Sequence, residues 1–90
     1  MKVEFDAAKR AGTLEQRSLD MARAGEVLDG ATLTIEDDRM DYGEPRYITI
    51  GFLDERMVVL VWTPRGDVHR IISIRKANDR EKAIYEPRFR

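Results

Sequence analysis

The sequence contains no cysteine, which excludes disulfide bonds, cysteine–zinc sites and thiol nucleophiles. It also lacks a long apolar run. The longest one, from Met57 to Trp62, is far shorter than the roughly 20 residues that a helix needs to cross a bilayer. No apolar segment follows Lys2, so we expect no signal peptide. We therefore expect a soluble, cytoplasmic protein that does not associate with membranes.

The chain has little material beyond one small core. Its 90 residues predict a single domain over 1–90, in which about 60–65% of the surface of the unfolded chain is buried. Hydrophobic residues make up 42% of the chain, which is enough for a core and excludes a fully disordered protein.

Charge of both signs is plentiful but unevenly distributed. Residues 1–63 hold 8 Lys and Arg against 13 Asp and Glu, whereas residues 64–90 hold 8 against 4. The net charges of these parts are −5 and +4, and the total is −1. Two interpretations stay open: the acidic part packs on the basic part, or the basic part forms a site for anions.

Helix signals lie near both ends of the chain. Asp6 is a suitable N-cap for a helix over Ala7–Arg17, and Asp20 for a second helix that ends near Gly30. Asn78 or Asp79 begins a terminal helix that runs to about Tyr85.

Strand signals fill the middle of the chain, where polar and apolar residues alternate. The expected strands are 32–35, 46–53, 57–63 and 68–74, and short loops connect them. Phe5-Asp6 has the pattern of the end of a short strand before the first helix. The whole order predicts an α+β fold with this short strand, two N-terminal helices, an antiparallel sheet of three to four strands and a C-terminal helix. We expect the helices to lie on one side of the sheet.

The last expected strand carries the clearest candidates for chemistry. Regular alternation places His69, Ile71, Ser73 and Arg75 on one face, and Arg70, Ile72, Ile74 and Lys76 on the other. Arginine and histidine together suit a ribonuclease that uses no metal. Such an enzyme takes a proton from a ribose 2′-OH, protonates the leaving oxygen and stabilises the charge on phosphorus. In the other interpretation these side chains are solvated strand ends paired with carboxylates.

The acidic stretch 36–44 does not have the spacing of an EF-hand loop, so a solvated loop or a partner of the basic strand is favoured over a metal site. Phosphate-binding glycine loops and the Gly-x-Ser-x-Gly motif are absent. Tyr42, Tyr47 and Tyr85 are candidates for stacking on an unpaired base.

A set of motifs spread over residues 3–85 resembles one family. The motifs are Phe5-Asp6-x-x-Lys9, Asp37-Asp38-Arg39-x-Asp41-Tyr42-Gly43-Glu44-x-Arg46, Gly51, Arg56, Trp62-Thr63-Pro64-Arg65-Gly66-Asp67, Arg70-Ile71-Ile72-Ser73-x-Arg75-Lys76-Ala77, Arg80-Glu81 and Tyr85. This pattern is similar to that of BrnT-type toxins of bacterial type II toxin–antitoxin pairs.

The resemblance implies a RelE-like fold and an intracellular ribonuclease that cleaves RNA, inhibits translation and needs neither metal nor cofactor. It implies a hetero-oligomer with a ribbon-helix-helix antitoxin, through which DNA is contacted only indirectly. The implied catalytic positions are Arg65, Arg70, Arg75, Lys76, Glu44 and Tyr85. The RNA-binding candidates are Arg46, His69, Arg80 and Tyr42.

The chain departs from the family pattern after the first helix. Gln16-Arg17-Ser18 stands where many members carry Lys-His-Gly. Three alternatives stay open: an active ribonuclease, a catalytically inactive RelE-like module that only binds its antitoxin, or an unrelated structural α+β domain whose charges form only a solvated surface.

Overall fold

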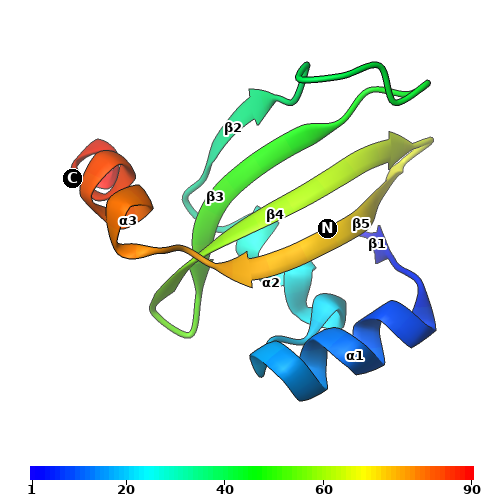
Figure 1. The fold of residues 1–90 in the computed structure, drawn as a ribbon, viewed down its shortest axis with the longest axis horizontal. Helices are drawn as coiled ribbons and strands as arrows, with labels where there is room; N and C mark the ends of the chain where they lie inside the picture. Colours follow the sequence, from blue (N-terminus) through cyan, green and yellow to red (C-terminus); the bar gives the residue numbers. More distant parts are fainter.

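Five strands form one mixed sheet in the computed structural model, which describes residues 1–90 (Figure 1). The strand order across the sheet is β1-β5-β4-β3-β2. The strands are β1 (Val3–Glu4), β2 (Leu33–Glu36), β3 (Tyr47–Leu53), β4 (Arg56–Arg65) and β5 (Val68–Lys76). The antiparallel meander from β2 to β5 confirms the predicted connections.

The predicted sheet of three to four antiparallel strands is too small, because β1 adds a fifth strand that runs parallel to β5. Val3 pairs with His69, and Glu4 pairs with Arg70. Two residues are too few to show a period of two, and their partners lie more than 60 residues away along the chain. The short strand that the sequence predicts just before the first helix is present, although it ends at Glu4 rather than at Phe5-Asp6, and its parallel pairing with β5 could therefore not be predicted.

The helical segments begin at residues that can cap them. The Asp6 side chain accepts a hydrogen bond from the Lys9 amide, and Asp20 accepts one from Ala22. The segments are α1 (Ala7–Arg17), η1 (Met21–Arg23), α2 (Ala24–Asp29), α3 (Asp79–Tyr85) and η2 (Glu86–Phe89), where η marks a 3₁₀ turn. The second predicted helix therefore starts as a 3₁₀ turn. None of these helices combines the length and the apolar character that a membrane span requires.

One face of the sheet packs against the N-terminal helical segments. Its core joins side chains of η1 and α2 to alternate residues of the strands, and α1 lies along the edge formed by β5 and β1 (Figure 1). The buried residues of this core are Leu19, Met21, Ala24, Val27, Leu53, Val58, Leu60, Ile71 and Ile74. We call this side of the sheet the helix face.

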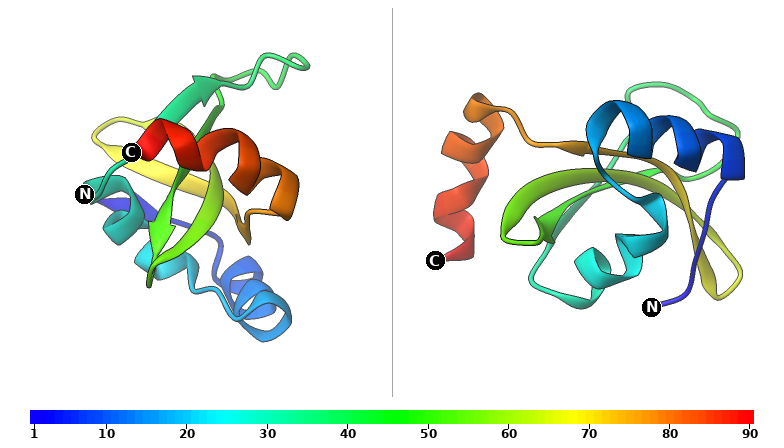
Figure 2. Two further views of the ribbon diagram at one scale, coloured as in Figure 1. Left: turned by 90° about the vertical axis from the view of Figure 1, so that its left-hand side faces the viewer. Right: turned by 90° about the horizontal axis from the view of Figure 1, so that it is seen from below.

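The opposite side, which we call the open face, is covered only at one end. There, Tyr85 of α3 and Phe89 of η2 pack on a second cluster of Ile50, Met57, Val59 and Ala77. The expectation of helices on one side is therefore wrong: α3 lies across the sheet from α2 (Figure 2). Helical periodicity does not encode the sheet face on which a helix packs.

Gly51 of β3 allows α2 to approach the sheet closely. A Cβ atom at this position would lie 2.6 Å from Cγ1 of Val27 and 3.2 Å from Cγ2 of Thr32. The position therefore excludes every larger residue unless α2 moves away from the strand.

Candidate functional site

A β-bulge in β5 decides which candidate side chains share a face. Val61 of β4 pairs with Ser73, but the next residue, Trp62, pairs with Ile71, so Ile72 has no partner. Ile71 and Ile74 consequently both enter the core of the helix face, although three positions separate them.

The predicted distribution over the two faces is wrong beyond Ile72. Regular alternation separates Arg70 from Arg75, whereas the extra residue places both on the open face together with Ser73. His69 and Lys76 point to the helix face instead. The sequence contains no signal for this bulge, because Ile71, Ile72 and Ile74 are all apolar.

Two candidate arginines lie on either side of Thr63 at the uncovered end of the open face. Thr63 pairs with Arg70, and the register of β3 places Arg46 across from Thr63 on the other side. Neighbouring strands are about 4.8 Å apart, so roughly 10 Å separates the two arginine backbones. The Thr63 hydroxyl donates a 2.6 Å hydrogen bond to the Pro45 carbonyl, which attaches the preceding loop to β4.

Arg65 and Glu44 extend this group toward the end of β4. Arg65 lies two residues beyond Thr63 and therefore on the same face. Its guanidinium is 3.6 Å from a Glu44 carboxylate oxygen. We call Arg46, Thr63, Arg65, Arg70 and Glu44 the end cluster.

The loop before β3 holds Arg46 by an aromatic contact. The Arg46 guanidinium carbon lies 4.0 Å from the centroid of the Tyr42 ring, and the Tyr42 hydroxyl donates to Asp37. Asp37 also accepts two 2.8 Å hydrogen bonds from Arg39. Hydrogen bonding from Arg39 lowers the Asp37 pKa to about 2. The Nε atom of Arg46 is buried and has no hydrogen-bond partner.

The end cluster supports both interpretations of the charge distribution. Glu4 and Glu44 belong to the acidic part of the chain, and they lie 3.6 Å from Arg70 and Arg65 of the basic part. These distances exceed hydrogen-bond length, so the guanidinium N–H groups of Arg65 and Arg70 remain available to another acceptor. Arg46 forms no ion pair with a carboxylate.

Arg75 lies on the open face at the covered end, where it forms a much tighter pair. Its guanidinium donates hydrogen bonds of 2.7 and 2.8 Å to the two carboxylate oxygens of Glu81 on α3. The hydrogen bonding from Arg75 lowers the Glu81 pKa to about 2. A carboxylate with both oxygens occupied and such a low pKa is a poor proton acceptor at neutral pH.

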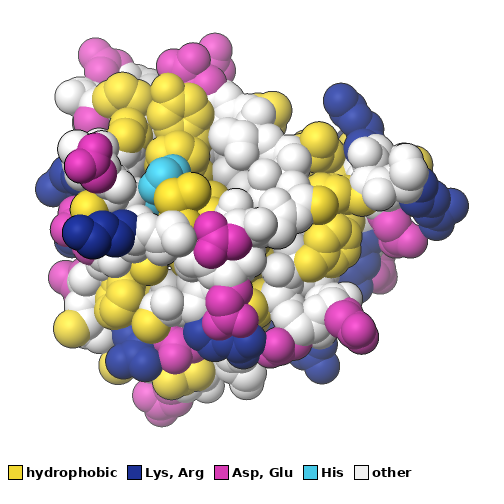
Figure 3. Space-filling view, turned by 180° about the vertical axis from the view of Figure 1, so that it is seen from behind, with side chains coloured by type: hydrophobic (Ala, Val, Ile, Leu, Met, Phe, Trp, Pro, Cys, Tyr) yellow, Lys and Arg dark blue, Asp and Glu magenta, His cyan; other side chains and the backbone are white.

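The remaining candidates are dispersed. Tyr85 packs in the second cluster, Arg80 is exposed on α3, and Lys76 lines a pocket near the β3–β4 hairpin. His69 packs against Trp62, with ring centroids 4.2 Å apart. Its ring is the single histidine on the surface in Figure 3, where apolar side chains lie beside it. The structure thus brings together Arg46, Arg65, Arg70, Glu44 and Tyr42, and leaves Arg75, Lys76, Tyr85, Arg80 and His69 outside this group.

The departure from the family pattern lies at the end of α1, away from the end cluster. Arg17 donates a 3.0 Å hydrogen bond to the Ile74 carbonyl of β5, so in this chain it fastens the helix to the sheet. Ser18 adopts a left-handed conformation with φ of 58°.

The acidic loop 36–44 does not form a metal-binding group. Asp37 and Glu44 instead pair with arginines, and no three His, Cys, Asp or Glu side chains anywhere in the molecule are close enough together to hold a metal ion.

The chain matches a model of a known protein family. Residues 5–81 match a family described as "Ribonuclease toxin, BrnT, of type II toxin-antitoxin system". The match includes the whole end cluster and ends before Tyr85. No curated protein matches the chain.

Proposed function

We propose, from the premise that this chain belongs to the BrnT family of ribonuclease toxins of type II toxin–antitoxin systems, that it cleaves RNA at the end cluster without a metal ion. The supporting observation is the row of Arg46, Thr63 and Arg70 across the uncovered end of the sheet. The guanidinium groups at the two ends of this row suit the binding of a phosphodiester, because each can donate two parallel hydrogen bonds to phosphate oxygens.

In the proposed reaction, the ribose 2′-oxygen attacks the adjacent phosphorus and the bond from phosphorus to the 5′-oxygen breaks. The products are a 2′,3′-cyclic phosphate and a free 5′-hydroxyl. Glu44 takes the 2′-hydroxyl proton, and water supplies a proton to the leaving oxygen. Arg46, Arg65 and Arg70 stabilise the charge that develops on phosphorus.

Glu44 is a better proton acceptor than Glu81 for a geometric reason. Its contact with Arg65 is 3.6 Å long, whereas both oxygens of Glu81 accept short hydrogen bonds. Tyr42, beside Arg46, is in position to stack on a neighbouring base. The family resemblance also suggests Arg75, Lys76 and Tyr85 for catalysis, and His69 and Arg80 for RNA binding. We treat these positions as secondary, because they lie outside the end cluster.

The proposed setting is the cytoplasm, where cleavage of RNA inhibits translation until a ribbon-helix-helix antitoxin covers this single RelE-like domain. β2 is an edge strand of the sheet, and its Ile35 side chain on the open face is 49% exposed. An added strand or an amphipathic segment of the antitoxin would cover this face.

The experiment is cleavage of a defined RNA by purified protein in the presence of EDTA. We expect products that carry a 2′,3′-cyclic phosphate, and no cleavage when the 2′-hydroxyl is methylated. Arg70→Gln and Glu44→Gln should each reduce the rate by at least about 100-fold, which is typical of a positioned catalytic group. Lys9→Gln removes an exposed cation of α1 and serves as the control that should retain the wild-type rate.

A catalytically inactive module that only binds its antitoxin is the second candidate. It is favoured by one observation: Arg65, Arg70 and Arg75 each have a carboxylate within 4.0 Å. In that case purified wild-type protein binds the antitoxin tightly but cleaves no RNA. Expression without the antitoxin would then leave growth unaffected, which contradicts the proposed ribonuclease.

A further inference from the structure

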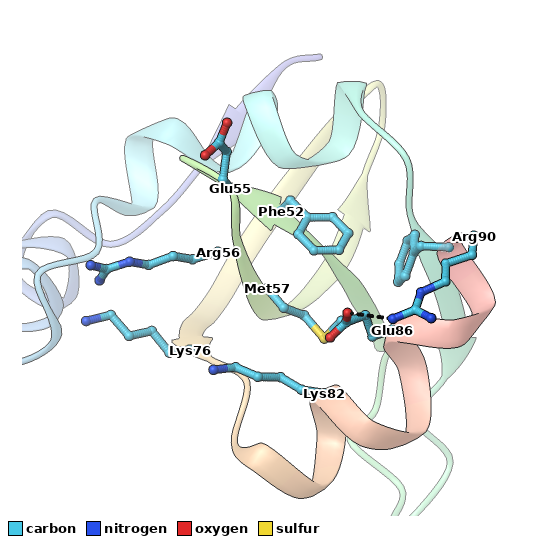
Figure 4. A pocket seen from close by; sticks show the side chains of 9 residues that line it. Phe52, Glu55, Arg56, Met57, Lys76, Lys82, Glu86 and Arg90 are labelled. Carbon is cyan, nitrogen blue, oxygen red and sulfur yellow. Dashed lines mark hydrogen bonds and ion pairs between the residues drawn. The ribbon is translucent and has the colours of Figure 1, made fainter.

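A pocket of about 600 Å³ opens at the end of the sheet opposite to the end cluster (Figure 4). It lies between the β3–β4 hairpin and the C-terminal helical segment. Its apolar wall consists of Phe52, Met57 and Phe89, and the two phenylalanine rings meet edge to face at 4.9 Å. The other lining residues are charged: Glu55, Arg56, Lys76, Lys82, Glu86 and Arg90.

The cations of this pocket are incompletely neutralised. Glu86 pairs with Arg90 at 3.1 Å, and Lys82 only reaches the exposed Asp79 at 4.0 Å. Arg56 and Lys76 form no ion pair with any carboxylate of the chain. Figure 4 shows the Arg56 and Lys76 side chains extending in the same direction from the end of the sheet, on the side away from the Phe52 ring, with Lys82 of α3 beside them.

Three elements hold these cations near one another. Arg56 begins β4, Lys76 ends β5, and Lys82 lies in the middle of α3. Since α3 packs on the second cluster through Tyr85, the position of Lys82 relative to the strands is fixed by the fold. Like charges in this arrangement repel one another, and an anion bound between them relieves the repulsion.

We propose that this pocket binds a backbone phosphate of the RNA substrate, remote from the bond that is cleaved. The inference rests on the proposed function, which supplies the RNA. Arg56 and Thr63 are seven residues apart on β4, so the pocket lies roughly 23 Å from the end cluster along the strand. A single-stranded RNA longer than a few nucleotides reaches both places.

A nucleotide fits this pocket better than an acidic peptide does. The phosphate presents several acceptor oxygens to one guanidinium and two ammonium groups at once, and an adjacent base can contact the ring of Phe52 or Phe89. Lys82 and Phe89 lie beyond residue 81, where the family match ends. The pocket is therefore partly a feature of this chain rather than of the matched region.

The test measures binding of a 2′-O-methyl RNA of twelve nucleotides, which cannot be cleaved, by fluorescence anisotropy at several salt concentrations. The variant Arg56→Gln/Lys82→Gln removes two exposed charges of the pocket and leaves Lys76 intact. The matched control Lys2→Gln/Lys9→Gln removes two exposed charges near the N-terminus. Circular dichroism of each variant checks that the fold is kept, and the single variant Lys82→Gln provides a second, milder test.

We expect the pocket variant to bind about fivefold more weakly than the control, with a slope of log affinity against log salt that is smaller by about 1.4. Equal affinity and slope for the two variants overturn the proposal. The proposal is also overturned if amide chemical shifts show that inorganic phosphate binds in the pocket but RNA affinity does not change. The proposal is also overturned if an acidic peptide binds in the pocket and RNA affinity stays unchanged. Cleavage of unmodified RNA is measured separately, so failure of the ribonuclease proposal is distinguishable from failure of this one.

Discussion

Ser18 explains, at the scale of a single residue, what the departure from the family pattern changes. The residue ends α1 in the left-handed conformation, and its amide donates to the Leu14 carbonyl at 3.1 Å. Glycine, which many family members carry there, adopts this conformation without the steric cost that a Cβ atom brings. In this chain the position therefore serves the turn at the end of α1, which lies outside the end cluster.

Ser18→Gly should consequently stabilise the protein. We expect a gain of about 1 kcal/mol, because the left-handed conformation costs an L-residue roughly 1–2 kcal/mol and glycine gives back part of this through chain entropy. The melting temperature should rise by about 5 °C. Ser18→Ala keeps the Cβ atom and should give no gain, so equal melting temperatures for the two variants would contradict this explanation.

Individual residues also mark where sequence reasoning fails at the site. Arg65, Arg70, Glu44 and Arg46 are all named by the sequence motifs, and the fold brings them together. Their closeness depends on the registers of three strands, which no single motif contains. His69 is the counterexample, since its ionisable ring marks it as a candidate from the sequence, while the register directs it to the helix face.

Elements with a clear local signal could be predicted from the sequence. α1 and α3 begin next to capping side chains, and the β3–β4 hairpin turns at Asp54-Glu55, where both residues have positive φ. The features that were missed are non-local: the parallel pairing of β1 with β5, the bulge at Ile72 and the face on which α3 packs. Each depends on which distant segment lies alongside, so amphipathic periodicity alone does not determine it.

The cap at the start of α3 also positions a side chain of the open face. Asn78 and Glu81 form a capping box, in which each side chain accepts a hydrogen bond from the backbone of the other. Glu81 accepts from Arg75 at the same time. The cap therefore orients the carboxylate that holds this arginine.

Asn78→Ala should cost about 1 kcal/mol of stability, the usual effect of losing an N-cap. It should also loosen the contact between Arg75 and Glu81, which would appear as faster hydrogen exchange of the amides at the start of α3. Asn78→Asp retains a capping oxygen and is the matched control. If both variants are as stable as the wild type, the capping box does not contribute to the fold.

For the whole molecule, carboxylates with lowered pKa values make the free energy of unfolding depend on pH. Hydrogen bonds from Arg10, Arg39 and Arg75 lower the pKa values of Asp20, Asp37 and Glu81 to about 2. Because these values lie below those of the unfolded chain, the folded state binds fewer protons than the unfolded state in this range. Their contribution to stability is complete above about pH 5 and is lost as the pH falls toward 2.

The melting temperature should therefore fall steeply between about pH 4.5 and pH 2. Glu81→Gln should lower stability by about 1 kcal/mol at pH 7, because a charge-assisted hydrogen-bonded pair is lost at a partly exposed position. At pH 2 the difference from the wild type should become smaller, since about half of the wild-type Glu81 carboxyl is then protonated. Glu15→Gln, at an exposed position of α1, is the control. A difference that stays constant from pH 7 to pH 2 would contradict the linkage.

The unpaired Ile72 also has a consequence for how the chain tolerates deletions. If this residue alone is removed, β5 becomes a regular strand in which every remaining side chain keeps its side of the sheet. Loss of Ser73 instead would let Ile72 take its place opposite Val61, so Ile74 and Arg75 would also keep their sides of the sheet. The chain should therefore tolerate the loss of one residue at Ile72 or Ser73 with Arg70 and Arg75 still on the open face, and a series of single-residue deletions along β5, read out by melting temperature, would locate this place.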